Sequence, residues 1–365
     1  AATDGGGGGS AAQRGDVTAD TRVAMSASYV HDSVVCSVAF SHDGKWLATG
    51  CNRAALLYEV GGAVAPCHTF TAGSDSDADV YVRSVCFSPV ASLLAMASED
   101  KIIRVYDTND ASLAGTLTGH QLDVYTLTWS SDGNFLVSGS GDKTARMWRW
   151  NDRQCVLTVG GDSNGPTDGV TSVAISNDSS SIATGSLDHT VRLFDAATGA
   201  STAVLASHGD SVYSVDFADN NYTLVSSSLD HTIRVWDLRQ SPNCSSTVLH
   251  GHNDFVLSVR FGNRDTTIMS GSKDQTVKLW DLRVNSAVLS IHGHSNSVIS
   301  VGLSPRNGQF ASGGGDCLAR LWSLRGDENA GGGDVAVTAI ATALPPPKPQ
   351  PRDDGVPTGV VATDA

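Results

Sequence analysis

Histidine, serine and aspartate recur together along this chain in arrangements that could support a metal site or a hydrolytic triad. His250-Gly251-His252 and His292-Gly293-His294 each place two imidazoles close together, as a zinc site would require. His120, Ser140 and Asp142 supply the three residue types of a nucleophilic triad. Zinc prefers three or four converging ligands, which a histidine pair does not supply. A structural role for these residues is therefore the first alternative to consider.

The spacing of the same residues favours that structural role. In four segments a histidine precedes a tryptophan by the same interval, 148 − 120 = 28 residues in the first of them. The four pairs are His120/Trp148, His208/Trp236, His252/Trp280 and His294/Trp322. An interval held over four copies predicts a repeat architecture. The serine, histidine and aspartate residues then become copies of one structural unit.

Each repeat is predicted to supply four short strands. In the third repeat these are roughly residues 124–129, 135–138, 145–149 and 155–158, and Asp132-Gly133 is a hairpin signal between the first two. Aligning the repeats on their third strands gives seven terminal aromatic residues: Tyr58, Tyr106, Trp148, Phe194, Trp236, Trp280 and Trp322. Four short antiparallel strands in a period of about 40–45 residues are typical of a propeller blade. The predicted fold is therefore an all-β, seven-bladed β-propeller.

The predicted domain boundaries follow from composition. Residues 1–16, rich in Gly, Ala and Ser, are expected to be a flexible leader, and residues 17–325 the propeller. Residues 326–365 are expected to be a disordered Gly/Pro-rich tail. The seventh repeat lacks an obvious fourth strand, so we expect Val23–Ser28 to pair into the last blade and cover its edge. Val335–Leu344 is the rival for that edge.

Charge and cysteine content narrow the function classes. The formal net charge of −14 argues against direct binding to nucleic acid. The seven cysteines are scattered, which favours reduced thiols over a disulfide framework. No apolar run is long enough to span a membrane, so no membrane partner is expected.

The Gly-His, Asp and Trp pattern with its Asp-x-Thr turns resembles the WD40-repeat family over about Val23–Arg325. Several segments resemble, more closely, the C-terminal propeller of the fungal Tup-type general transcriptional corepressors. They are DSVVCSVAFSHDGKWLATGCN (32–52), VYVRSVCFSP (80–89), GHNDFVLSVRF (251–261), SGSKDQTV (270–277) and GHSNSVISV (293–301).

The WD40 resemblance implies a hydrogen-bond network in each complete blade. The histidine is expected to bond the turn aspartate and a serine or threonine, and through that hydroxyl the indole N–H. The predicted sets are His120/Ser140/Asp142/Trp148, His208/Ser228/Asp230/Trp236 and His252/Ser272/Asp274/Trp280. Repeat seven has Gly314 at the expected serine position, and repeats one, two and four depart further from the pattern.

Strand alternation predicts which side chains stand on the face that carries the turns between second and third strands. We expect this face to bind protein through positions in or before the first strands and before the turn aspartates. The predicted binding residues are Cys36, Tyr81, Arg83, Glu99, Tyr125, Tyr213, Leu229, Phe255, Leu257, Lys273, Asn296 and Ile299. Tyrosine is enriched at binding hot spots. The corepressor resemblance implies that short segments of DNA-binding repressors dock on this face.

The expected function is a non-enzymatic scaffold in the nucleus, without a cofactor. The resemblance implies DNA-binding transcription factors as partners. It also implies a TPR-repeat partner, bound through a helical segment absent from these residues, since no heptad pattern precedes residue 31. Two alternatives stay open: a substrate-receptor propeller of a ubiquitin ligase, and a signalling scaffold of the G-protein β type.

Overall fold

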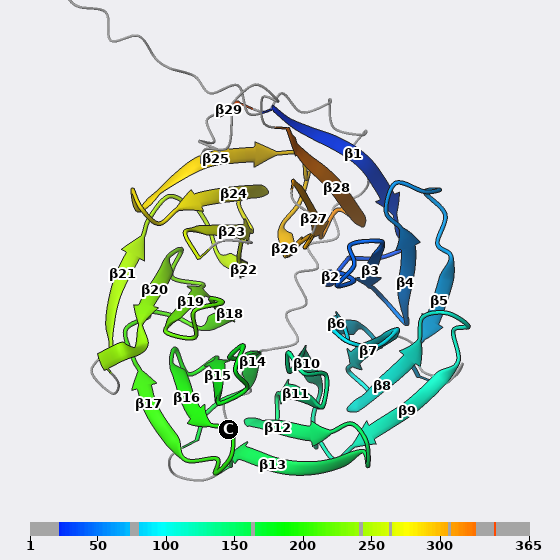
Figure 1. Ribbon diagram of the computed structural model, residues 1–365. Helices are drawn as coiled ribbons and strands as arrows, with labels where there is room; N and C mark the ends of the chain where they lie inside the picture. Colours follow the sequence, from blue (N-terminus) through cyan, green and yellow to red (C-terminus); the bar gives the residue numbers. More distant parts are fainter. Residues whose placement is uncertain are drawn as a thin grey trace, which may run out of the picture.

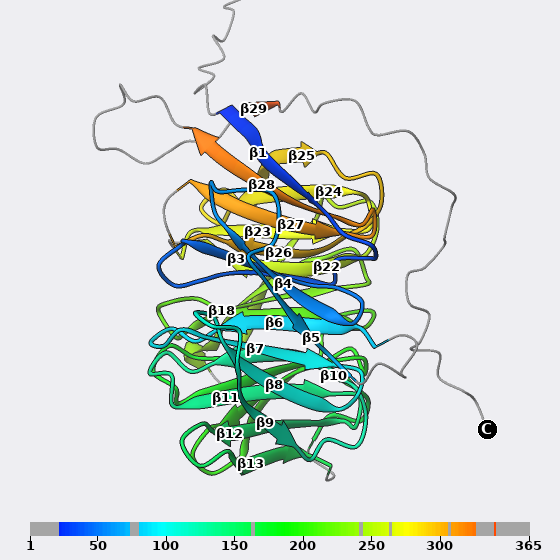
Figure 2. The same cartoon turned by 90° about the vertical axis from the view of Figure 1, so that its right-hand side faces the viewer.

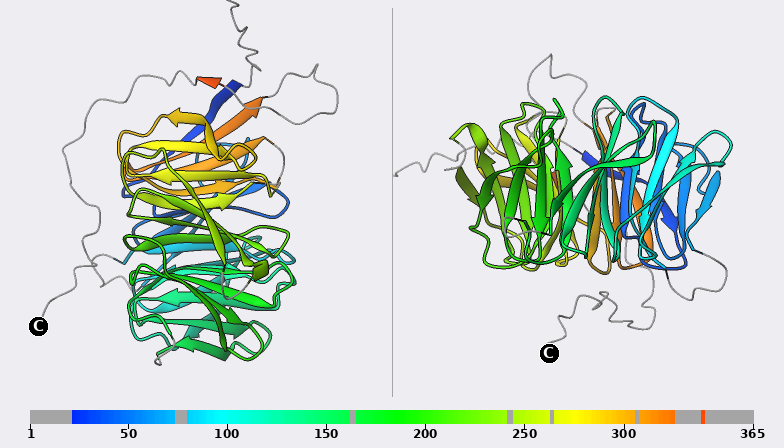
Figure 3. Two further views of the ribbon diagram at one scale, coloured as in Figure 1. Left: turned by 90° about the vertical axis from the view of Figure 1, so that its left-hand side faces the viewer. Right: turned by 90° about the horizontal axis from the view of Figure 1, so that it is seen from below.

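Seven sheets, each with four antiparallel strands, stand around a central axis like the blades of a propeller (Figure 1). The structure is a computed structural model, and it describes residues 22–73, 80–161, 165–240, 244–262, 265–305, 308–325 and 339–340. The first strand of each blade lies nearest the axis and the fourth lies on the rim (Figure 1). Figures 2 and 3 show the blades edge-on, stacked side by side into a thick disc. The prediction of a seven-bladed propeller is confirmed.

Strands follow one another outward from the axis in each blade. Blade one consists of β2 Ser37–Phe40, β3 Trp46–Gly50, β4 Ala54–Glu59 and β5 His68–Thr71. Blade two consists of β6 Val82–Phe87, β7 Leu93–Ser98, β8 Ile102–Asp107 and β9 Leu113–Thr118. Blade three consists of β10 Val124–Trp129, β11 Phe135–Ser140, β12 Thr144–Arg149 and β13 Gln154–Gly160. Blades four and five consist of β14 Val170–Ile175, β15 Ser181–Ser186, β16 Val191–Asp195 and β17 Ser201–Leu205; β18 Val212–Phe217, β19 Thr223–Ser228, β20 Ile233–Asp237 and β21 Ser245–Leu249. Blades six and seven consist of β22 Val256–Phe261, β23 Thr267–Ser272, β24 Thr276–Asp281 and β25 Ser286–His292; β26 Val298–Leu303, β27 Gln309–Gly314, β28 Leu318–Arg325 and β1 Arg22–Val30. A 3-10 turn, η1 Leu238–Gln240, follows β20.

The two ends of the ring meet in blade seven. Strand β1 pairs antiparallel with β28, with Met25 opposite Trp322 and Tyr29 opposite Ala319. Tyr29 is 2% exposed and packs in the cluster between blades seven and one. This confirms that the N-terminal segment covers the edge of the last blade.

The rival segment 335–344 does not occupy that edge. Of its residues only β29 Ala339–Ile340 is described, and it pairs in parallel with β25 in blade six. The predicted leader 1–16 lies outside the described residues, and so does the predicted tail 326–365 apart from β29.

The hydrophobic core is divided among the interfaces between neighbouring blades. Seven buried clusters fill the seven interfaces, each combining residues of two adjacent sheets. Glycine in a second strand allows the close approach, because a Cβ on Gly139 would lie 2.7 Å from Val170 Cγ1 of the next blade. No helix in the described part of the chain is long and apolar enough to cross a membrane.

Candidate functional site

The histidine, aspartate and tryptophan of a complete repeat meet in one buried network. In blade three, Nδ1 of His120 donates to Asp142 Oδ2 at 2.8 Å, so Nε2 can accept from the Ser138 hydroxyl at 2.8 Å. The indole Nε1 of Trp148 donates to the same Ser138 oxygen at 2.8 Å. Burial alone would raise the pKa of Asp142, but hydrogen bonds from His120 and Thr144 hold that pKa well below its usual range.

The bridging serine is not the one predicted from the sequence. Ser138, Ser226 and Ser270 bridge His to Trp in blades three, five and six, where Ser140, Ser228 and Ser272 were expected. Residues two apart in a strand point to the same side, so alternation could not separate the two candidates. The register decides, because the bridging Ser138 lies opposite Arg146, within reach of the indole of Trp148.

The predicted serines have a different role. Ser140 Oγ donates to Leu122 O at 3.1 Å and accepts from the Asp142 amide at 3.1 Å. Ser228 and Ser272 make the same pair of contacts in their own blades. They fix the turn between the second and third strands to the loop that enters the blade.

Blade seven has a complete network despite Gly314. His294 Nδ1 lies 2.9 Å from Asp316 Oδ1 and 2.6 Å from an Arg320 guanidinium nitrogen, and Ser312 Oγ lies 2.7 Å from His294 Nε2. Trp322 Nε1 donates to Ser312 at 2.8 Å. The prediction that repeat seven lacks its serine was wrong for the same reason of register.

Repeats that depart from the pattern hold the turn with other groups. In blades two and four, where no Gly-His occurs, Arg104 and Arg192 contact Asp100 and Asp188 at 2.7 and 2.6 Å. In blade one, His31 Nε2 lies 2.8 Å from the hydroxyl of Thr49 and 3.3 Å from that of Tyr58.

The histidine pairs do not have the geometry of a metal site. Both ring nitrogens of His252 are engaged, by Asp274 at 2.8 Å and Ser270 at 2.7 Å, while His250 is exposed. His294 is engaged in the same way. Among the described residues, no group of three or more His, Cys, Asp or Glu side chains could hold a metal ion. His252 and His294 therefore have a structural role within their blades.

We call the side of the disc that carries the turns between second and third strands the top face. The loops that enter the first strands reach the same face, because Gly141 N donates to Asp123 O at 3.0 Å and Glu99 N to Tyr81 O at 3.2 Å. Eleven of the twelve predicted binding residues are at least partly exposed. The exception is Cys36, which is 9% exposed, and burial raises the pKa of its thiol to about 11.

Arg83 organises the charged part of the top face. Its guanidinium contacts the Glu99 carboxylate, with Nε donating to Oε1 at 2.7 Å, and lies 5.6 Å from the ring centre of Tyr81. Glu99 also accepts from the Tyr81 amide at 3.1 Å. Burial raises the pKa of both Tyr125 and Tyr213, and the charge of Arg83 opposes that shift at both phenols. Arg83, Tyr125 and Tyr213 therefore share one electrostatic environment around the axis.

Aromatic and aliphatic side chains occupy the other side of the same face. Lys273 Nζ lies 4.7 Å from the ring centre of Phe255, and the imidazole of His231 lies 5.7 Å from that ring. Leu229, Leu257 and Ile299 belong to the same side and are partly exposed. Asn296 is exposed, and its Oδ1 accepts from the Ser297 amide at 2.7 Å.

The family model for the WD domain, G-beta repeat, matches residues 25–59, 65–107, 111–149, 153–195, 199–237, 243–281 and 285–323. Each match covers the fourth strand of one blade and the first three strands of the next blade along the chain. This chain belongs to the WD40 family.

Among WD40 proteins, the chain is similar to several transcriptional corepressors. It is 49% identical over 147 residues to the general transcriptional corepressor tupA of Dictyostelium discoideum, covering 40% of this chain and 25% of tupA. It is 43% identical over 97 residues to the transcriptional repressor rco-1 of Neurospora crassa, covering 27% and 16%. It is 36% identical over 157 residues to the general transcriptional corepressor TUP1 of Saccharomyces cerevisiae, covering 29% and 22%. The matches thus span a quarter or less of these relatives.

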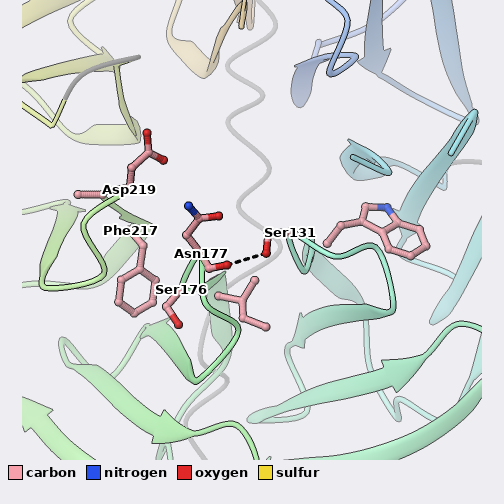
Figure 4. A pocket seen from close by; sticks show the side chains of 8 residues that line it. Ser131, Ser176, Asn177, Phe217 and Asp219 are labelled. Atoms are coloured by element: carbon pink, nitrogen blue, oxygen red, sulfur yellow. Dashed lines mark hydrogen bonds between the residues drawn. The ribbon is translucent and has the colours of Figure 1, made fainter. Parts of the chain in front are cut away.

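The opposite face of this WD40 disc carries a shallow recess (Figure 4). Its cavity volume is about 160 Å³, and Trp129, Ile175 and Phe217, at the ends of three first strands, contribute its apolar part. Ser131 Oγ donates to Asn177 O at 2.6 Å across its rim (Figure 4). None of the predicted binding residues lines this recess.

Sequence reasoning missed one feature of the top face. The residue after the turn aspartate, or after Asn52 in blade one, adopts a left-handed backbone conformation; in blades two and three it is lysine, Lys101 with φ 69° and Lys143 with φ 66°. Both lysines are exposed. Comparing this position across repeats would have revealed them.

Proposed function

We propose that this chain is a non-enzymatic scaffold whose top face docks short segments of DNA-binding repressors and links them to a corepressor complex in the nucleus. The observation that carries the proposal is the set of partly exposed aromatic and aliphatic side chains around the axis, in a chain similar to transcriptional corepressors. Exposed Tyr, Phe and Leu side chains concentrated on one face are typical of binding hot spots. Direct contact with DNA is not part of the proposal, because the net charge is −14.

The arrangement suits a short extended segment. Tyr125, Tyr213 and Leu257 come from three blades and all lie next to the axis, since each belongs to the first strand of its blade. One segment crossing the axis can therefore contact several blades at once. The Arg83–Glu99 pair would set its register, since a partly buried charge pair discriminates against unmatched partners.

The test is a double substitution on this face. Tyr213→Asp with Leu257→Asp introduces two carboxylates into partly buried apolar positions, and we expect binding to short segments tiled from DNA-binding repressors to fall at least about tenfold. Circular dichroism and thermal unfolding establish that the variant is folded. A folded double variant that retains native affinity overturns the proposal.

The further partners are tested separately. A TPR-repeat protein is proposed to belong to the same complex. A substrate receptor of a ubiquitin ligase would instead shorten the lifetime of the proteins that dock. Bound repressors whose abundance is unchanged when this protein is deleted would exclude that alternative.

A further inference from the structure

We propose that the segment docked on the top face carries acidic side chains at the end that lies over blades two and three, where Lys101 and Lys143 bind their carboxylates. This inference rests on the proposed docking function and adds the chemical class of the partner. It starts from an asymmetry in the ring of seven equivalent turn positions.

The asymmetric position follows the turn aspartate, or Asn52 in blade one. The seven residues, with φ between 61° and 70°, are Arg53, Lys101, Lys143, His189, His231, Gln275 and Cys317. Cationic side chains thus occupy blades one to three, and histidine or neutral side chains occupy the others. The same backbone shape is kept in all seven blades, so the fold does not require a lysine at this position.

The two lysines are available for a partner. Both side chains are exposed. Among the described residues, neither ammonium group makes a hydrogen bond or an ion pair. The neighbouring carboxylates are already engaged: Glu99 with Arg83, Asp100 with Arg104, and Asp142 with His120. Asp123 is another carboxylate near Lys101: burial raises its pKa, and the charge of Lys101 opposes that shift.

Cations on the opposite face are arranged differently. Lys45, Arg149, Arg239 and Arg283 pair with Asp43, Asp152, Asp237 and Asp281 at distances between 2.5 and 3.4 Å. Each of these pairs joins residues two or three positions apart in one turn. Unpaired lysines on the top face of a chain with net charge −14 therefore point to an external anionic group.

The two lysines also lie close to the residues that we propose bind the docked segment. Lys101 lies in the same turn as Glu99, whose carboxylate reaches the Tyr81 amide and Arg83. Lys143 lies two residues after Gly141, and a Cβ added to Gly141 would be 3.0 Å from the Tyr125 hydroxyl. A segment whose apolar residues cover Tyr125 and Leu257 would pass its next residues over these turns.

The test uses a random peptide library displayed on phage and selected on the native protein. Peptides that bind are expected to combine an apolar core with Asp or Glu on one side of it. With Lys101→Glu and Lys143→Glu together, we expect the enrichment of acidic residues to disappear and selected acidic peptides to bind about fivefold more weakly. The loss should be large at about 0.15 M NaCl and small at about 1 M NaCl, where screening is stronger.

Two controls separate the possible results. Arg149→Glu with Arg239→Glu changes the net charge equally on the opposite face and should leave the selection unchanged. Selected peptides that lack acidic enrichment, or whose enrichment survives the double lysine reversal, overturn this inference while leaving apolar docking intact. A selection that yields no peptide dependent on Tyr213 and Leu257 overturns the docking face itself.

Discussion

The amide nitrogen of Val38 in blade one donates to Oγ of Ser300 in blade seven at 3.1 Å, joining residues 262 positions apart. A related contact recurs around the axis: a first-strand hydroxyl of each blade accepts from a backbone amide of a neighbouring first strand, except that Ser214 donates to the Val259 carbonyl. The other six contacts are Ser37–Val85, Ser84–Leu127, Thr126–Val173, Ser172–Val215, Ser214–Val259 and Ser258–Val301. Seven hydroxyls thus form a closed belt, which complements the closure of the rim by β1 and β28.

Removing one hydroxyl of the belt should weaken the closure. Ser300→Ala leaves the buried amide of Val38 without its acceptor, and we expect the free energy of unfolding to fall by about 1–3 kcal/mol. Urea unfolding followed by tryptophan fluorescence measures the change. Ser295→Ala, an exposed serine in the preceding loop, should change it by less than about 0.5 kcal/mol. Equal effects of the two substitutions would contradict a role for the belt.

The identity of the bridging serine can be tested in blade five. Ser226→Ala leaves His208 Nε2 and the Trp236 indole without their shared partner, so we expect a loss of about 2–4 kcal/mol. Ser228→Ala removes contacts only in the turn and should cost about 1 kcal/mol. The thermal or urea unfolding of the two variants decides between them. A larger loss for Ser228→Ala would restore the assignment made from the sequence.

Close packing between blades should make Gly185 intolerant of a side chain. A Cβ at this position would lie 2.8 Å from Val212 Cγ1 in the next blade, so Gly185→Val should cost at least about 3 kcal/mol or prevent folding. Soluble yield and melting temperature report the effect. Gly209→Ala is the matched control, because its Cβ would meet nothing closer than 3.7 Å. A Gly185→Val variant as stable as the native protein would show that blades four and five are not in tight contact.

The Asp188–Arg192 pair predicts a dependence of stability on pH. Burial opposes ionisation of Asp188, but hydrogen bonds from Thr190, the Thr167 amide and Arg192 lower the carboxyl pKa to about 2. The unfolded pKa is about 3.9. Because the folded pKa is the lower of the two, the stabilisation is present above about pH 4 and is lost as the pH falls toward 2.

Asp188→Asn should therefore destabilise the protein at pH 7, and the difference from the native protein should shrink between pH 4 and about pH 2–3. Chemical unfolding at a series of pH values measures this difference. Asp152→Asn, which removes an exposed carboxylate on the opposite face, controls for the change in net charge. A difference that stays constant down to pH 3 would show that the Asp188 pKa is not lowered.

The sequence by itself determined the repeat, the number of blades and the strand that closes the ring. Each of these depends on local pattern: the interval from His120 to Trp148, the hairpin at Asp132-Gly133, and the position of Val23–Ser28 before His31. The WD40 resemblance implied the histidine, aspartate and tryptophan of the network, and the structure brings these three residues together.

Only the tertiary structure decided the contacts that depend on register and on neighbouring blades. Ser138 and Ser140 lie on the same side of one strand, so the choice between them needed the pairing of β11 with β12. The burial of Cys36 depends on its surroundings in the folded ring, and the contact of Arg192 with Asp188 depends on the turn between β15 and β16. The sequence also could not show whether Lys101 and Lys143 form ion pairs. Their neighbours Glu99 and Asp142 are engaged by Arg83 and His120, which only the folded blades bring close.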